Sequence, residues 1–193
     1  DAFGCDLVYT NKENILQQAF VSDNKIEFID CIDDNIINHC NKYSITKGEV
    51  ALSYKDFTNT ICENINSFEF LTFDYGDRFP RNDFSTRVYE KHNVYPIFED
   101  NLPLEKLFKK SDITYDAHFN YLSDCFKENN IKEIKFNTQL KSLVEFGILD
   151  SSLIHISEPT RPERNSYAVF CLTKKNPTYN QLLLIHYSME IAA

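Results

Sequence analysis

An apolar, aromatic-rich run over 68–76, FEFLTFDYG, ends in an acid, an aromatic residue and a glycine. A run of this length without helical spacing predicts a buried strand, and Gly76 permits a backbone bend that other residues resist. In open parallel α/β sheets, ligands bind beyond the carboxyl ends of strands, so Asp74 would lie within reach of a cofactor or substrate. The alternative is a strand followed by an ordinary Asp-containing turn.

The segment 77–101 is a long polar stretch rich in Arg, Asp, Asn and Pro. A loop of this length inside a compact domain is usually functional or disordered. Arg87 is expected either to bind an acidic partner or to pair structurally with Asp83 or Glu90. His92 is expected to be either an ordinary loop histidine or a general base.

Several other functional classes lack the residues that they need. The six Cys show no CxxC or metal-ligand spacing, and neither a glycine-rich phosphate loop nor a hydrolase elbow occurs. The net charge of -9 would repel a nucleic-acid backbone. No stretch reaches the roughly 18 apolar residues of a membrane span, and no signal peptide opens the chain. The sequence predicts a cytoplasmic protein with reduced thiols, no nucleic-acid partner and no membrane span.

The pattern of apolar residues predicts an α/β layer fold, in a length that suits one domain of 193 residues. A capping box of Ser53 and Asp56 is expected to start one helix, Asp116 a second, and Thr138 a third that ends at Gly147. The segment 31–43 is ambiguous between helix and loop. Strands are expected over 5–10, 15–21, 25–30, 85–89 and 131–136, of which 15–21 and 25–30 form a hairpin.

Three segments, taken in order, resemble the MidA family of S-adenosylmethionine-dependent methyltransferases. They are FLTFDYGD with the downstream STRVYEKH, then SDITYDAHFNYL, then FNTQLKSLVEFGIL. The order and spacing of these pieces are specific, whereas any single piece is not. The family's motif positions correspond here to Asp74, Tyr75 and Gly76; Thr86, Arg87 and His92; Asp112, Ile113, Thr114 and Phe119; and Gln139, Gly147 and Ile148.

Two upstream elements extend the resemblance to about residues 1–150. Gly48–Glu49–Val50 resembles the family's G-E-[IV] element, and Asp1–Ala2–Phe3 resembles the tail of its N-E-L-x-D-A-[LF] motif. The sequence departs from the pattern at Ala117, where the family usually has Val, and at His118, where it usually has Asp. The family's glycine-rich E-x-G-x-G loop lies upstream of residue 1, so no cofactor-binding residue is assigned in this chain.

The resemblance implies the C-terminal half of a class I, Rossmann-like methyltransferase fold, truncated at both ends. It also implies S-adenosyl-L-methionine as cofactor and a protein substrate, because mitochondrial members methylate an arginine on a respiratory complex I subunit and assist its assembly. The fragment alone is expected to be inactive. The alternative is a non-catalytic assembly factor or protein-binding module that keeps the fold and recognises a partner through 77–101.

Methylation of a protonated arginine needs carboxylates that neutralise and orient the guanidinium. The resemblance points to Asp1 and Asp74 as catalytic residues, at the ends of neighbouring parallel strands. Asp74 could instead cap loop amides. The substrate contacts that the resemblance implies are Tyr75, Gly76, Arg87 and His92. Asp112, Thr114 and Asp116 are expected to cap a helix, with substrate contact as the alternative.

The segment from Ser152 does not continue the family pattern and resembles a translated DNA library adapter. An adapter read encodes Leu153 to Arg161, and the adapter end that follows an index encodes Ser166 to Leu172. Residues 152–175 are therefore interpreted as read-through, and 151–193 as a non-native, poorly ordered tail. A genuine hairpin with Pro159 and Pro162 in its loop is the alternative.

Overall fold

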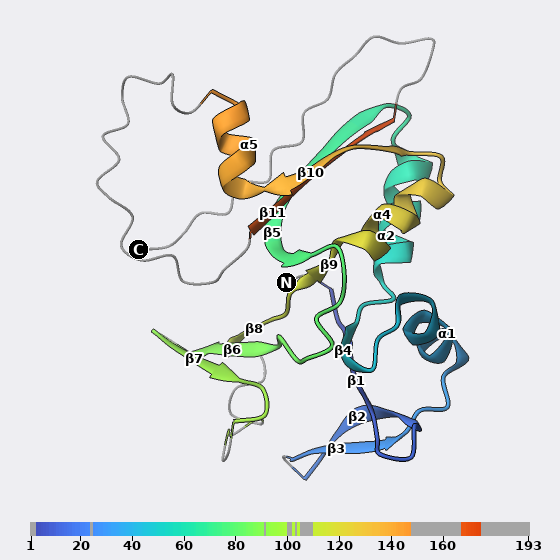
Figure 1. The fold of residues 1–193 in the computed structure, drawn as a ribbon, viewed down its shortest axis with the longest axis vertical. Coiled ribbons are helices and arrows are strands. Elements are labelled where there is room, and N and C mark those ends of the chain that lie inside the picture. Colours follow the sequence, from blue (N-terminus) through green and yellow to red (C-terminus); the bar gives the residue numbers. More distant parts are fainter. Residues whose placement is uncertain are drawn as a thin grey trace. The chain divides into compact units, whose positions relative to one another are not determined.

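A computed structural model describes residues 3–23, 25–90, 92–99, 102, 104 and 110–147, and the backbone of a strand over 167–174. The chain divides into two compact units (Figure 1). Unit 1 comprises Asp1–Phe57 and Arg78–His118, and unit 2 comprises Thr58–Asp77 and Phe119–Ala193. Each unit is therefore built from two separate stretches of the chain.

Unit 1 contains an antiparallel sheet in the order β3-β2-β1-β4. The predicted hairpin is confirmed: β2 pairs with β3 from Gln17 opposite Asp30 to Ser22 opposite Lys25. Asp23, in the turn, has a φ of +47°, a conformation that Asp tolerates better than most residues. The strands are β1 (Asp6–Thr10), β2 (Leu16–Ser22), β3 (Lys25–Asp30) and β4 (Lys47–Val50).

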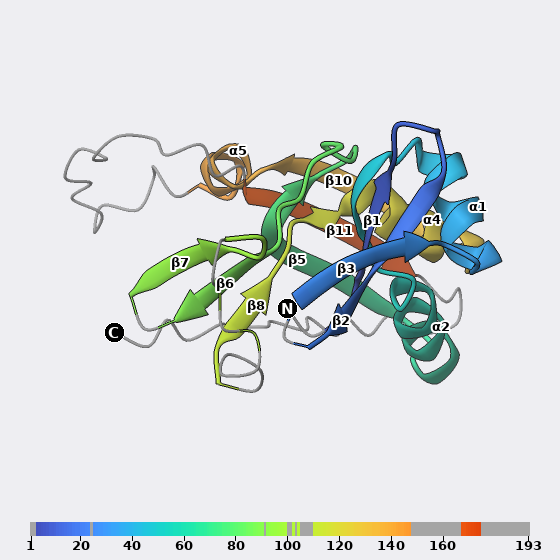
Figure 2. The same cartoon turned by 90° about the horizontal axis from the view of Figure 1, so that it is seen from below.

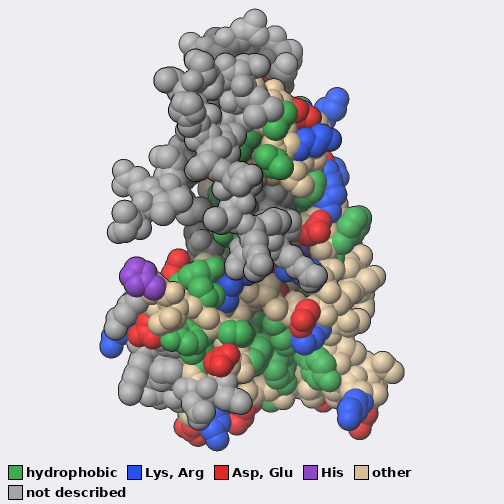
Figure 3. Space-filling model, turned by 60° about the vertical axis from the view of Figure 1, so that its left-hand side comes forward, with side chains coloured by type: hydrophobic (Ala, Val, Ile, Leu, Met, Phe, Trp, Pro, Cys, Tyr) green, Lys and Arg blue, Asp and Glu red, His purple; other side chains and the backbone are tan. Residues whose placement is uncertain are grey.

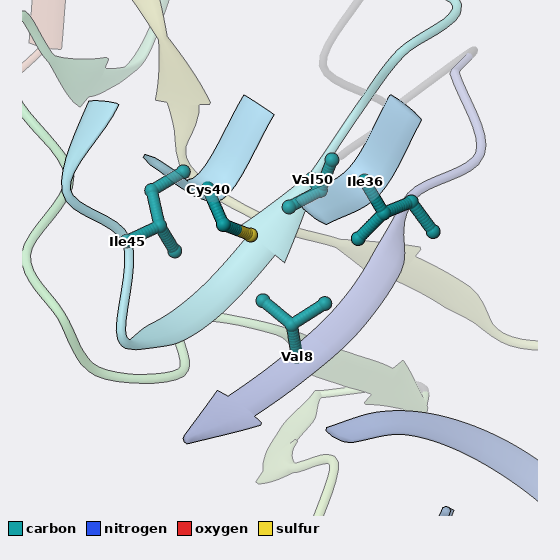
Figure 4. Packing of buried hydrophobic residues seen from close by; sticks show 5 residues of the cluster. All are labelled: Val8, Ile36, Cys40, Ile45 and Val50. Atoms are coloured by element: carbon teal, nitrogen blue, oxygen red, sulfur yellow. The ribbon is translucent and has the colours of Figure 1, made fainter. Parts of the chain in front are cut away.

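Helix α1 (Asp34–Tyr43) resolves the ambiguous segment 31–43. The Asp33 side chain caps it by accepting the N–H of Asn35 at 2.8 Å, and the helix ends at Ser44 in the left-handed conformation. Its inward residues join a core of Val8, Ile36, Cys40, Ile45 and Val50 (Figure 4). Each fully buried Val or Ile contributes roughly 1.5–3 kcal/mol, so this core holds α1 against the sheet.

A second antiparallel sheet in unit 1 takes two of its three strands from the segment 77–101, which was predicted to be a long loop. Its order is β7-β6-β8, with β6 (Arg87–Glu90), β7 (Asn93–Pro96) and β8 (Asp112–Thr114) (Figure 2). Val88 and Ile97 form its core, against which Leu7 and Ile26 of the first sheet pack. Because neighbouring residues of a strand point to opposite faces, β1 presents Val8 to α1 and Leu7 to this second sheet.

Unit 2 contains the strands β5 (Phe68–Asp77), β10 (Lys132–Thr138) and β11 (Tyr167–Lys174). Strand β11 lies between the other two and is antiparallel to both. Strands β5 and β10 therefore run in the same direction. Strand β11 falls within the segment 151–193; the adapter origin of that segment stays a prediction, which the source DNA tests.

Helix α4 (Phe119–Glu128) packs with its predicted apolar face inward, since Phe119, Leu122, Cys125 and Phe126 are buried. The Phe126 ring lies 5.2 Å from that of Phe70 on β5, between centroids. Helix α2 (Tyr54–Asn64) continues from unit 1 into unit 2. Unit 2 also includes α5 (Gln139–Glu145).

The predicted start and end of α5 are confirmed. Thr138 accepts the N–H of Lys141 at 3.4 Å, and Gly147 has a φ of +81°. The predicted capping box at Ser53 is wrong, because Ser53 Oγ is buried without a hydrogen-bond partner. Ile148 lies outside the described residues.

Two further observations differ from the sequence predictions. Among the described strands, the pairs whose register the structure gives, namely β1–β2, β1–β4, β2–β3, β6–β7, β6–β8, β5–β11 and β10–β11, are antiparallel, whereas parallel neighbours were expected. Asp116 does not start a helix: β8 and β9 (Ala117–His118) flank it, and α4 begins at Phe119. Sheet pairing on both sides of Asp116 prevails over the local capping signal.

No helix among the described residues has the length and apolar character to cross a membrane.

Candidate functional site

The residues predicted to form the site divide between the two units. Asp74, Tyr75 and Gly76 belong to unit 2, whereas Arg87 and His92 belong to unit 1. Asp1 lies outside the described residues, so its catalytic role and its position beside Asp74 stay predictions.

Asp74 lies inside β5 rather than at its end, which corrects the prediction that the strand stops at the acid. It pairs with Ala168 of β11, and the strand continues to Asp77. Asp74 Oδ1 accepts the N–H of Tyr75 at 2.8 Å. Gly76 is buried with a φ of +152°, a conformation that side chains rarely adopt. The conformational reason for a glycine here is therefore present in the structure.

Arg87 lies in a compact cluster of charged and polar side chains in unit 1. Its Nη1 donates to Asp116 Oδ1 at 3.0 Å and to the carbonyl of Ser85 at 3.2 Å, and its Nε donates to the hydroxyl of Tyr89 at 3.0 Å. Arg81 Nη2 lies 3.1 Å from the other carboxylate oxygen, Asp116 Oδ2. We name these three charged residues the Arg81–Asp116–Arg87 cluster.

The acidic partner of Arg87 differs from both that were predicted. Asp83 pairs instead with Lys47, and a hydrogen bond from Lys47 holds the pKa of Asp83 below its ordinary value. The partner is Asp116, which lies 29 residues further along the chain. Local sequence spacing cannot reveal such a pair, because β8 brings Asp116 back beside β6.

The surroundings of Arg87 favour the charged form of its guanidinium. Burial by itself lowers the pKa of Arg87, but hydrogen bonds to Tyr89 and Asp116, together with the Asp116 charge, more than offset it. The pKa of Arg87 is therefore raised. Arg87 is 22% exposed and Asp116 12%, so the pair is shielded from much of the screening that weakens surface ion pairs.

Glu49 holds the segment that leads into β6. Its Oε1 accepts the N–H of Ser85 at 2.7 Å, the N–H of Thr86 at 2.8 Å and the hydroxyl of Thr86 at 2.7 Å. Ser85 Oγ in turn accepts the N–H of Asp116 at 2.9 Å. The structure thus joins two sequence elements, at 48–50 and 85–87, that the family resemblance treats as separate motifs.

His92 and the expected capping residues have simpler environments. His92 is exposed in the turn between β6 and β7, and its substrate role stays a prediction. The predicted helix-capping role of Asp112 and Thr114 is wrong, because both lie in β8 and pair with β6. Asp116 is likewise not a helix cap, since its carboxylate binds two guanidiniums.

A second group of titratable side chains in unit 1 lies between α1 and β9. The ring centroids of His39 and Tyr43 are 4.7 Å apart, and those of Tyr43 and His118 are 4.8 Å apart. Burial, and then the nearby charges of His118 and Lys42, lower the pKa of His39 to about 4. His39 is therefore neutral at physiological pH.

The residues of this chain do not by themselves fit a complete site for S-adenosylmethionine. The four glycines, at positions 4, 48, 76 and 147, are too far apart along the chain to form a glycine-rich loop. A Cβ at Gly48 would lie 3.5 Å from the Asp83 carbonyl, which is an ordinary van der Waals contact. Among the described residues, no group of three or more His, Cys, Asp or Glu could hold a metal ion.

Two solved structures from Burkholderia thailandensis share the fold of this chain. One, a COG1565 superfamily protein, has a TM-score of 0.64 and 16% sequence identity, over 88% of this chain and 51% of that one. The other, a COG1565 superfamily member and candidate methyltransferase bound to S-adenosyl-homocysteine, has a TM-score of 0.62 and 14% identity, over 90% of this chain and 51% of that one.

This chain therefore spans about half the length of the solved structures that it matches. At these identities, the likeness shows that the chains share a mixed α/β fold. The structure of one of the two proteins contains bound S-adenosyl-homocysteine. The sequence matches no family profile and no curated protein.

Proposed function

We propose that this chain is part of a longer S-adenosylmethionine-dependent methyltransferase that methylates a protein side chain, an arginine. The observation that carries the proposal is the fold shared with a candidate methyltransferase bound to S-adenosyl-homocysteine. The product form of the methyl donor in that protein supports a methyl donor as the cofactor here. The MidA-like motifs occur along this chain in the order found in that family. This resemblance supports an arginine as the side chain that is methylated.

The strands of unit 2 support a class I, Rossmann-like assignment within this proposal. Strands β5 and β10 run in the same direction, and β11 is inserted antiparallel between them. Same-direction strands joined through helices are typical of α/β sheets with ligand sites at one edge. The region around the C-terminal part of β5, with Asp74, is the place proposed for the reaction.

Asp74 is proposed to orient the guanidinium of the substrate. The Asp74 carboxylate accepts the Tyr75 N–H, and a carboxylate can also pair with a guanidinium through charge-assisted hydrogen bonds. A charge-assisted pair of this kind fixes both the position and the plane of the side chain. The methyl donor supplies the reactive group when bound; the proposed role of Asp74 is to bind and orient the acceptor.

Calorimetric titration of the protein encoded by the complete gene with S-adenosylmethionine tests the cofactor. We expect saturable binding, and its absence would exclude the catalytic proposal. Asp74→Asn is expected to retain cofactor binding while transfer to an arginine peptide falls about 100-fold or more, as for loss of a positioning contact. Glu63→Gln, at an exposed carboxylate of α2, is the matched control; unchanged transfer in both variants would remove Asp74 from the site.

A second candidate function is a non-catalytic assembly factor or binding module. The exposed apolar side chains of the 77–101 segment favour it: Phe79 is 69% exposed, Val94 51% and Phe98 40%. Figure 3 shows hydrophobic side chains at the surface among charged ones. Under this alternative, Phe79→Ser and Val94→Ser would abolish partner capture, and the complete protein would bind no S-adenosylmethionine.

A further inference from the structure

Arginine has an uneven distribution in this chain. Within residues 1–150 it occurs only at positions 78, 81 and 87, whereas lysine supplies the other permanent positive charges there. A guanidinium binds planar or tetrahedral oxyanions through a fork of parallel N–H groups, which an ammonium group cannot do. The concentration of arginine in one short segment indicates that guanidinium geometry matters there.

The Arg81–Asp116–Arg87 cluster holds two of these guanidiniums in defined positions. Each oxygen of Asp116 contacts one arginine, at 3.0 Å for Arg87 and 3.1 Å for Arg81. Arg87 is held further by Tyr89 and by the carbonyl of Ser85. Because the arginines are fixed by a shielded carboxylate, a ligand would not bear the full entropic cost of ordering two long side chains.

Arg81 differs from Arg87 in how much of it remains accessible. Its side chain is 51% exposed, and Asp116 is its only contact that the structure specifies within the described part of the chain. The contact with Asp116 uses Nη2, and about half of the Arg81 side chain stays exposed. With two arginines and one aspartate, the cluster carries a formal charge of +1 in a protein whose net charge is -9.

We propose that the Arg81–Asp116–Arg87 cluster is a binding site for an oxyanion, either a carboxylate or a phosphate group. Arg81 binds the ligand directly, Arg87 adds positive charge, and Asp116 is the positioning residue that orients both guanidiniums. This site depends on contacts within unit 1 alone. It therefore stands whether or not the protein transfers methyl groups.

The test is a titration of the isotopically labelled full chain by NMR, with the amide signals of Ser85 and Asp116 as reporters. The probes are a capped tetraglutamate peptide and inorganic phosphate, with a capped tetraglutamine peptide as the uncharged control. Arg81→Gln is expected to weaken binding about tenfold, as for loss of a charge-assisted hydrogen bond. Lys12→Gln, at an exposed lysine in the turn between β1 and β2, removes the same charge and should bind like the unmodified chain.

A response to the peptide alone identifies a carboxylate as the ligand, and a response to phosphate alone identifies a phosphate. If neither probe shifts the reporter signals, or if Arg81→Gln and Lys12→Gln bind equally well, the site does not exist. Arg81 is half exposed, so its substitution should leave the fold intact.

Asp116→Asn separates an oriented site from simple attraction by charge. The substitution raises the charge of the cluster, so unspecific attraction predicts tighter binding, whereas loss of the positioning residue predicts weaker binding. Far-UV circular dichroism checks that this variant folds. If it does not, Arg81→Lys replaces it, because lysine keeps the charge without the fork; binding by Arg81→Lys equal to that of the unmodified chain would overturn the proposal.

Discussion

Protonation of His39 is expected to make unit 1 less stable in mildly acidic solution. His39 lies on α1 and is only 6% exposed. Its ring centroid is 4.7 Å from that of Tyr43 and 6.2 Å from that of His118. Burial, followed by the charges of His118 and Lys42, together lower the pKa of His39 from 6.5 to about 4. His39 therefore binds a proton more weakly in the folded chain than in the unfolded chain.

The size of the effect follows from the difference between the two pKa values. Between pH 6.5 and pH 4 the unfolded state binds more protons than the folded state, so stability falls as the pH falls. The loss attributable to His39 is about 2 kcal/mol between pH 7 and pH 5. Below pH 4 the loss of stability reaches a plateau of about 3 kcal/mol, because each unit of difference between the two pKa values corresponds to about 1.4 kcal/mol.

Urea unfolding at pH 7 and pH 5 measures this loss, followed by far-UV circular dichroism because the chain has no Trp. His39→Gln keeps a polar, neutral side chain there and should lose about 2 kcal/mol less than the unmodified chain over this interval. His92→Gln is the matched control, since His92 is exposed between β6 and β7. An equal pH dependence in the unmodified chain and His39→Gln would refute the reasoning.

Other substitutions test the packing and the hydrogen bonds by urea unfolding at pH 7. Glu49→Ala removes the acceptor of three hydrogen bonds and should destabilise unit 1 by about 3 kcal/mol, whereas Glu13→Ala, at an exposed position, should change little. Phe126→Ala should cost about 3–5 kcal/mol, because the ring is fully buried; a loss below about 1 kcal/mol would contradict the packing of α4. Gly76→Ala should destabilise unit 2 by about 1–3 kcal/mol, through its φ of +152°. Removal of 151–193 takes away β11, so hydrogen-exchange protection of β5 should fall; unchanged protection would mean that β11 does not pair with it.

The sequence by itself determined the elements that depend on near neighbours. The hairpin of β2 and β3, the apolar face of α4, and the cap of α5 at Thr138 each involve residues a few positions apart. Hydrophobic periodicity and helix capping depend on residues within that range, so both can be predicted from the sequence. The richness of 77–101 in Arg was visible too, although the acidic partner of Arg87 was not.

Only the tertiary structure decided which distant residues meet and in which direction strands run. The sequence pattern assigned Asp116 to a helix start, but pairing of β8 with β6 places its carboxylate between two guanidiniums. Glu49 and Thr86 are likewise far apart in the sequence, and only the tertiary fold brings them within hydrogen-bond distance. Strand direction is also set by that path, because an apolar run such as β5 can pair in either sense, and here its unit 2 neighbour β11 comes from nearly 100 residues away.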